Sequence, residues 1–385
     1  MMELLLLVGL AVAAFVGFNI GGSSTGVAFG PAVGSNVVSK LGAAGLMTGF
    51  ALLGGWTVGR NVIKTMGGDI VPADTFTLAA SVGVLFFVGL ALLVSNTFGV
   101  PASTSMTAVG AIAGLGVASG TLDWAVMGEI VVWWLVAPIL AFWVCAVIGR
   151  YLYPYLDAAF PIEKSERSVL YLDGIRPRVA DDATSRELLA SVLVVAIGCY
   201  MAFSAGASNV ANAVAPLVGS GEITPSFGVI LAGAAIGVGA FTIARRTLDT
   251  VGNDLTDLPL LAALIVEVVS ASLITFLSFI GIPASLAVSA TMSIVGLGWG
   301  RATRTVKASD VARGDADATV SVNALAADRP DDVPAMGEED PDELVASDLF
   351  DPSTTARVVV LWVLTPSVAA VASWGLFSLI PLYTP

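Results

Sequence analysis

The sequence predicts an all-α polytopic membrane protein built from two homologous repeats, and three observations carry this prediction. Of the 385 residues, 56% are hydrophobic and 12% are charged, about half the charged share of a soluble domain. Apolar stretches of about 20 residues recur along the chain, each long enough to cross a bilayer. Two polar, glycine-rich stretches, residues 21–35 and 206–220, resemble each other at an offset of 185 (206 − 21).

Ordinary membrane spans are expected in two sets of four, one for each repeat. Residues 1–17 lack a basic segment and a polar cleavage region, so they are better explained as a first span than as a cleaved signal. The expected spans lie near residues 4–20, 41–59, 76–97 and 124–149, and then near 188–205, 225–244, 258–281 and 356–381.

Four further segments are expected to depart from ordinary spans. The two glycine-rich stretches carry Ser and Asn side chains that are costly against lipid, so they predict breaks in the helices. Two short apolar pieces, 101–119 and 283–300, each follow a proline and predict re-entrant hairpins. Counting them, the chain is expected to have roughly 10–12 membrane segments.

The repeat extends well beyond the two glycine-rich stretches. A T-x-x-R-x-x-φ-x-T-φ-G-x-D-φ pattern begins at Thr57 and recurs at Thr242, again 185 residues later. A Pro-Ala-Ser triplet at residues 101–103 recurs at residues 283–285. Agreement at a steady offset is the mark of an internal repeat. An inverted orientation of the two copies is favoured, because broken helices in both copies are typical of inverted-repeat transporters.

Charge divides the chain further. The loops that follow Gly149 and Gly300 hold most of the 17 basic residues, so both are expected to be cytoplasmic in a multi-pass protein of the cell membrane. Residues 314–355 are strongly acidic and read as a disordered linker. The expected organisation is an N-terminal membrane repeat, a linker loop, the first part of the C-terminal repeat, an acidic loop and a last transmembrane helix, at residues 1–150, 151–186, 187–300, 301–355 and 356–385.

Composition also excludes several function classes. A net charge of −13 without a basic stripe argues against nucleic acid as a partner. The chain has no histidine, and its two cysteines lie inside expected spans, so neither a metal site nor a cofactor is predicted. No clustered catalytic groups are available for an intramembrane enzyme. A passive channel is disfavoured because no series of charged or carbonyl rings is evident.

Two motifs resemble those of a known family. Residues 206–216 read GASNVANAVAP, which closely resembles the GANDVANA signature that the inorganic phosphate transporter (PiT) family carries once in each half. That family also has a P-x-S-T-T-H-x-x-x-G hairpin in each half, and residues 101–110 read PASTSMTAVG. The resemblance covers nearly all of the membrane part. It implies an inverted-repeat transporter of phosphate, driven by sodium or protons, with sulfate carried by related members.

The resemblance also implies which residues bind substrate. The substrate-binding positions matched to the family are Ser103, Thr104, Ser105, Ser285, Ser23, Ser24, Ser208, Asn209 and Asn212. Both signature aspartates are replaced, by Ser24 and Asn209, and the hairpin histidine is Met106. Independently of the family, helix N-termini with hydroxyl side chains can hold an oxyanion without lysine or arginine.

Cation or proton coupling is assigned to Glu267, together with Asn209 and Ser24. Glu267 lies well inside an expected span, where a carboxylate is expensive enough to suggest a function. Secondary active transport of phosphate by alternating access is the leading reading, with Na⁺ or H⁺ as the coupling ion. A sulfate or other oxyanion permease of the same fold is the alternative. The lipid bilayer is an obligate partner, and a homo-oligomer stays open.

Overall fold

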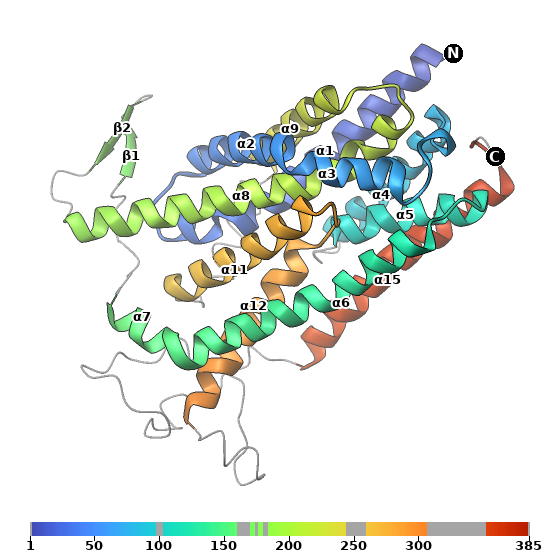
Figure 1. Cartoon of the computed structure of the whole chain (residues 1–385). Coiled ribbons are helices and arrows are strands. Elements are labelled where there is room, and N and C mark those ends of the chain that lie inside the picture. Colours follow the sequence, from blue (N-terminus) through green and yellow to red (C-terminus); the bar gives the residue numbers. More distant parts are fainter. Residues whose placement is uncertain are drawn as a thin grey trace, which may run out of the picture.

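The fold is a bundle of helices that run roughly along one axis (Figure 1). The computed structural model describes residues 2–97, 103–159, 170–173, 176–179, 184–243, 259–305 and 352–383. Most of the expected acidic loop, 301–355, lies outside the described residues. The expected division of the chain into repeats and loops stays a prediction.

The described residues of the N-terminal half form seven α-helices, two of them shorter than eight residues. Several begin at a side-chain cap: Ser39 accepts from the Gly42 amide, and Asp123 accepts from the amides of Ala125 and Val126. Two π-helical turns, Thr65–Asp69 and Ile148–Leu152, extend α3 and α6. The helices are α1 (Met2–Gly34), α2 (Lys40–Thr57), α3 (Gly59–Lys64), α4 (Leu78–Thr97), α5 (Thr104–Ser119), α6 (Trp124–Val147) and α7 (Tyr153–Ala159), with a 3-10 turn at Ala73–Thr75.

The C-terminal half repeats this order. Thr184 and Glu187 form a capping box at the start of α8, and Thr224 caps α9. Two short antiparallel strands, β1 (Leu170–Asp173) and β2 (Arg176–Val179), lie within the linker loop, where the sequence predicted no regular structure. The helices are α8 (Ser185–Gly219), α9 (Pro225–Thr242), α11 (Leu260–Phe279), α12 (Leu286–Ala302) and α15 (Pro352–Leu379), with a 3-10 turn at Thr303–Thr305.

Helix length and composition support six or seven of the expected membrane segments as full spans. Among the described residues, six helices are long and apolar enough to cross a membrane, and α2 with α3 makes a seventh span that is bent by 61°. The shorter helices α4, α5 and α12 bring the helical segments of the bundle to ten. The two short helices that follow prolines, α5 and α12, begin where the hairpins were predicted.

The predicted breaks at 21–35 and 206–220 are wrong. Residues 21–34 continue α1 and residues 206–219 continue α8, without interruption. The polar side chains are satisfied inside the helices: Thr25 Oγ1 donates to Gly21 O at 2.7 Å, and Ser208 Oγ donates to Ala205 O at 3.3 Å. Both stretches are largely buried against other helices and do not face lipid, so their polar residues need no break.

Glycines allow the two halves to interlock. A Cβ atom on Gly21 of α1 would collide with the Ile236 carbonyl of α9, and one on Gly206 of α8 would collide with the Ala51 carbonyl of α2. Both residues of the second contact are related to those of the first by 185 positions. Helix α1 therefore packs on α9 as α8 packs on α2, and each contact joins one repeat to the other.

A second reciprocal contact joins the hairpin helices to the long ones. A Cβ atom on Gly114 of α5 would meet the Ala370 carbonyl of α15, and one on Gly296 of α12 would meet the Phe142 carbonyl of α6. Each of the two short helices thus lies against the last helix of the opposite repeat. Small residues at such crossings let membrane helices approach to backbone contact.

The direction of these helices supports an inverted repeat. Gly17 faces Ala235 and Gly22 faces Ile243, so the contacts advance in the same direction along α1 and α9, which are parallel. A short turn with a left-handed residue, Gly221, joins α8 to α9 and reverses the chain. Helices α1 and α8 are therefore antiparallel, and Figure 1 shows them starting from opposite ends of the bundle.

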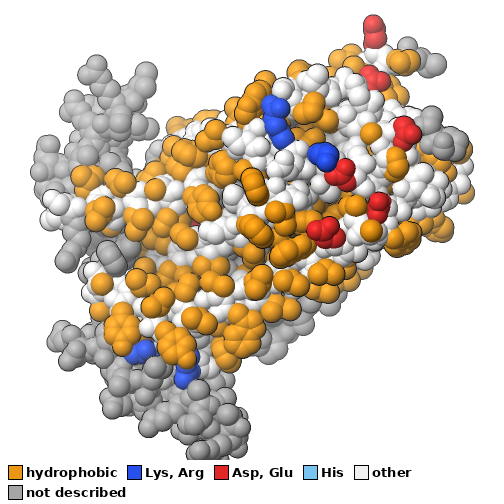
Figure 2. Space-filling model, in the orientation of Figure 1, with side chains coloured by type: hydrophobic (Ala, Val, Ile, Leu, Met, Phe, Trp, Pro, Cys, Tyr) orange, Lys and Arg blue, Asp and Glu red, His pale blue; other side chains and the backbone are white. Residues whose placement is uncertain are grey.

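The outside of the bundle suits a bilayer. Hydrophobic side chains are spread over the visible face of the described residues, and the acidic side chains gather towards the end that carries the chain termini (Figure 2). The exposed apolar residues include Leu135 and Ile139 of α6 and Phe276 of α11. Such a surface is ordinary against lipid tails and is not stable in water.

Candidate functional site

The second glycine-rich stretch and the first hairpin meet in the interior of the bundle. Asn212 of α8 donates from Nδ2 to Ser105 Oγ of α5 at 3.1 Å, and from the same nitrogen to Asn209 Oδ1 at 3.0 Å. Asn212 is fully buried and Ser105 is 1% exposed. The two segments are 107 residues apart in sequence, and this contact joins the two repeats. The oxygen of the Asn212 amide, Oδ1, is buried and has no hydrogen-bond partner.

The start of α5 offers hydrogen-bond donors at the same place. Ser103 Oγ accepts from the Met106 amide at 3.3 Å, and the Thr107 amide reaches Ser103 O at 3.0 Å. The amides of Thr104 and Ser105, in the first turn, have no partner within the helix. A helix N-terminus carries a partial positive charge. Together with these amides and the hydroxyls of Ser103 and Ser105, it forms a site that can bind an oxyanion.

The second hairpin is built alike but carries fewer hydroxyls. Ser285 caps α12 by accepting from the Val288 amide at 3.3 Å. Trp134 of α6 donates to the Pro283 carbonyl at 2.8 Å and fixes the chain just before this helix. Leu286 and Ala287 follow Ser285, where the first hairpin has Thr104 and Ser105. The N-terminus of α12 therefore has one side-chain hydroxyl in its first turn.

The first glycine-rich stretch is less involved than the sequence predicted. Ser23 is exposed, and its hydroxyl donates to carbonyls of its own helix, at Asn19 and Ile20. Ser24 is half-buried. In the described part of the chain, no hydrogen bond joins either residue to a hairpin. The structure thus brings Asn209, Asn212 and Ser105 together and leaves Ser23, Ser24 and Ser285 without such a contact.

Glu267 is a buried carboxylic acid residue of α11, one turn before a polar contact between α11 and α12. The side chain is 5% exposed, and its Oε1 atom has no hydrogen-bond partner. One turn along α11, Ser270 lies 3.2 Å from Ser293 of α12, oxygen to oxygen, and both are fully buried. Ser270 and Ser293 were not among the site residues expected from the sequence. In the sequence, only their spacing from Glu267 and from Ser285 could have suggested that they belong to a site. A single serine in a membrane span is common, so this spacing is a weak indication.

A pocket of about 710 Å³ opens at one end of the bundle. It is lined from both repeats, by Asp69, Asp123 and Glu129 of the first and by Ile280 and Ile282 of the second. Ile282 directly precedes the Pro283 hairpin, so the pocket extends towards the start of α12. Over the described residues, no group of three His, Cys, Asp or Glu side chains is arranged to hold a metal ion.

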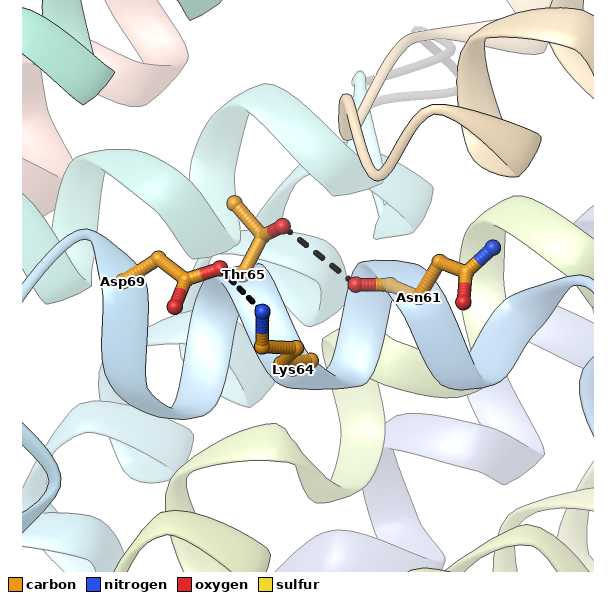
Figure 3. A network of polar contacts seen from close by, with 4 residues as sticks. All are labelled: Asn61, Lys64, Thr65 and Asp69. Carbon is orange, nitrogen blue, oxygen red and sulfur yellow. Dashed lines mark hydrogen bonds and ion pairs between the residues drawn. The ribbon is translucent and has the colours of Figure 1, made fainter.

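A small polar network borders this pocket (Figure 3). Lys64 Nζ lies 3.9 Å from Asp69 Oδ2, and Thr65 Oγ1 donates to Asn61 O at 3.3 Å. Asn61 Nδ2 in turn donates to Phe279 O of α11 at 2.7 Å. Lys64 is 80% exposed, so the ion pair contributes little to stability. The network ties the bent α2–α3 span to the second repeat.

Comparison with known proteins places the chain among anion transporters. The family model described as the phosphate transporter family matches residues 20–373. The sulfate permease CysP of Bacillus subtilis is 32% identical over 285 residues, covering 74% of each chain. A putative phosphate permease of Haemophilus influenzae is 24% identical, covering 74% of this chain and 86% of that protein. A solved structure, the sodium-dependent phosphate transporter, superposes with a TM-score of 0.65 at 18% identity, covering 98% of this chain and 99% of that one.

Proposed function

This chain belongs to the phosphate transporter family, and we propose that it carries inorganic phosphate across the cell membrane as a secondary active transporter. Alternating access follows from two inverted repeats that meet at mid-bundle, as in other inverted-repeat transporters. The substrate lies between the first turn of α5 and the Asn209–Asn212 segment of α8. Anion affinity comes from amides and hydroxyls, since neither segment carries lysine or arginine.

One observation supports this location most directly. The buried bond from Asn212 to Ser105 brings the second family signature against the first hairpin. At this contact the oxygen of the Asn212 amide is left without a hydrogen-bond partner. Buried polar groups are nearly always paired, so an orphaned one beside free donors suggests a ligand.

Coupling to a cation or proton is assigned to Glu267. Its carboxylate is buried without a partner at Oε1, in a segment where such a group is costly. It lies in the middle of α11, and this helix is followed by the hairpin that contains Ser285. Asn209 and Ser24 stay secondary candidates. The similar solved structure is that of a sodium-dependent phosphate transporter, which makes Na⁺ the first coupling ion to test.

The orientation in the membrane follows the basic residues. Among the described residues, Arg150, Arg301 and Arg304 lie together where α6 and α12 end, and Arg304 donates to the Arg150 carbonyl at 3.1 Å. We place this end of the bundle, with loops 151–186 and 301–355, in the cytoplasm. The acidic pocket at the opposite end then faces the outside.

Sulfate is the second candidate substrate. The relative named as a sulfate permease shares 32% identity, more than the putative phosphate permease described above. Both signature aspartates are absent here, and a carboxylate is the usual acceptor for the proton of hydrogen phosphate. Sulfate has no such proton and would not need that acceptor.

Uptake by proteoliposomes tests the function. The purified protein should concentrate radiolabelled phosphate when a sodium or proton gradient is imposed, and should stop when the gradient is collapsed. Accumulation against a phosphate gradient would exclude a passive channel. Proteoliposomes that take up neither phosphate nor sulfate under any gradient would remove the proposed function.

A further inference from the structure

We propose that Asn212 determines substrate specificity: its amide nitrogen positions Ser105 as a donor to the anion, and its amide oxygen accepts the acidic proton of a hydrogen oxyanion such as hydrogen phosphate. This inference rests on the proposed function and names the substrate class of the same site. It assigns the acceptor role of the missing signature aspartates to a neutral amide. Sulfate, which carries no proton at neutral pH, cannot use that acceptor.

The orientation of the Asn212 amide follows from its neighbours. Its Nδ2 faces two oxygens, Asn209 Oδ1 at 3.0 Å and Ser105 Oγ at 3.1 Å. Turning the amide over would set its oxygen against Asn209 Oδ1, which has no proton to donate, and this is unfavourable. Oδ1 therefore stays the free end, and it is buried without a hydrogen-bond partner.

The same contact sets the direction of the Ser105 hydroxyl. Ser105 Oγ accepts from Asn212, so its own proton must point elsewhere. No acceptor for that proton is present among the described residues. Ser105 is 1% exposed and stands in the first turn of α5, beside amides that have no partner in the helix. A hydroxyl donor and an amide acceptor thus stand side by side at a helix N-terminus.

A hydrogen oxyanion satisfies both groups, and a fully deprotonated one does not. Phosphate in neutral solution keeps at least one P–OH group, which can donate to Asn212 Oδ1 while other oxygens accept from Ser105 and the amides. Bound sulfate would leave Asn212 Oδ1 buried and unpaired. Leaving one buried polar group unpaired corresponds to a discrimination of about 5- to 100-fold.

The equivalent positions of the other repeat lack this pair of donor and acceptor side chains. The residues equivalent to Asn212 and Ser105 are Val27 and Ala287, at the repeat offsets of 185 and 182. Neither can donate or accept through its side chain. Recognition of the proton is therefore a property of the α5–α8 side of the site, and Asn212 is the residue to test.

Competition in proteoliposomes tests the proposal, with monofluorophosphate as the matched probe. Monofluorophosphate has nearly the shape of phosphate but no acidic proton at neutral pH. In the wild-type protein, phosphate should compete about 5- to 100-fold better than monofluorophosphate or sulfate. Asn212→Leu should bring this ratio close to one. Ser105→Ala should raise KM for all three anions and leave the ratio unchanged.

Two further variants keep the test interpretable if Asn212→Leu is poorly folded. Asn212→Asp keeps an acceptor and should retain the preference for phosphate. Ser204→Ala removes another buried hydroxyl of α8, one that bonds the Ala271 carbonyl at 3.1 Å, and should leave the ratio at the wild-type value.

Equal competition by phosphate and monofluorophosphate in the wild type would overturn the proposal. So would an unchanged ratio in Asn212→Leu, or an effect of that variant on sodium dependence alone. Absence of uptake of any anion by the wild type would instead refute the proposed function.

Discussion

At the scale of single residues, the buried side-chain atoms of the described chain that lack a hydrogen-bond partner include an amide oxygen and a carboxyl oxygen. Asn212 Oδ1 and Glu267 Oε1 are both without hydrogen-bond partners, and they lie on different helices, α8 and α11. The residues at equivalent places in the first repeat are Val27 and Leu85, which are apolar. The first copy of the repeat therefore folds with an apolar side chain at each of these two positions.

Glu267→Gln is expected to abolish gradient-driven accumulation while leaving phosphate exchange intact. The amide keeps the size of the carboxylate but can neither release a proton nor offer a negative charge to a cation. Counterflow and gradient-driven uptake, measured on the same proteoliposomes, separate the two activities.

The control is Glu222→Gln, which changes an exposed carboxylate in the turn between α8 and α9. That variant should accumulate phosphate like the wild type. If Glu267→Gln also concentrates phosphate normally, Glu267 has no part in coupling.

At the scale of helices, close crossings hold the two repeats together. Gly54 of α2 is packed against the Phe203 carbonyl of α8 so closely that a Cβ atom would collide with it. Gly49 lies on the same helix, is exposed, and has no heavy atom within 4 Å of the place where its Cβ would be. Both glycines lie in the interior of α2, but only Gly54 is packed against another helix.

Gly54→Ala should lower the apparent Tm by about 2–8 °C, because the helices must separate to admit the methyl group. Gly49→Ala should leave the Tm unchanged or raise it slightly, since alanine favours a helix by about 1 kcal/mol over glycine. Thermal unfolding of the two variants in one detergent checks this. Equal Tm values for the two variants would show that the α2–α8 contact can accept a methyl group at position 54.

Sequence reasoning found the helices but misjudged two of them. The apolar runs and the Pro-Ala-Ser triplets gave the spans and the starts of α5 and α12, because length, hydropathy and caps are local properties. The Ser, Asn and Gly content of residues 206–220 suggested a break. In the structure the same residues form the crossing with α2 and bond to each other. Small polar residues are found both at breaks in membrane helices and at close helix crossings. Only the helix that packs against them, which is remote in sequence, distinguishes the two cases.

The sequence predicted candidate site residues but not their arrangement in space. Family motifs identified Ser105, Asn209 and Asn212, but the sequence could not tell which signature faces which hairpin. The bond between α8 and α5 answers that for one pair. The unpaired end of the Asn212 amide depends on the orientation of two side chains, which no sequence pattern specifies.

At the scale of the whole molecule, the two repeats should lie upside down relative to one another in the membrane. The turn after α1 contains Asn36, and the equivalent turn after α8 contains Glu222; both residues are exposed. Parallel packing of α1 with α9 puts these turns at opposite ends of the bundle, as Figure 1 shows for the helices that they join.

Single cysteines at the two turns test this arrangement. Asn36→Cys and Glu222→Cys should react with a membrane-impermeant maleimide from opposite faces of sealed vesicles. The native Cys145 and Cys199 are buried and should give little background. Labelling of both variants from the same face would contradict the inverted repeat.

The central claim is that the first turn of α5 binds the transported anion through hydroxyls and amides, and the KM for phosphate uptake tests it most directly. A variant in which Ser103, Thr104 and Ser105 are all alanine should raise KM by about tenfold or more, since it removes two or three donors. Thr107→Val is the matched control, because its hydroxyl only bonds the Ser103 carbonyl within the same helix, and it should keep the wild-type KM. A wild-type KM in the triple alanine variant would place the anion elsewhere and contradict the account.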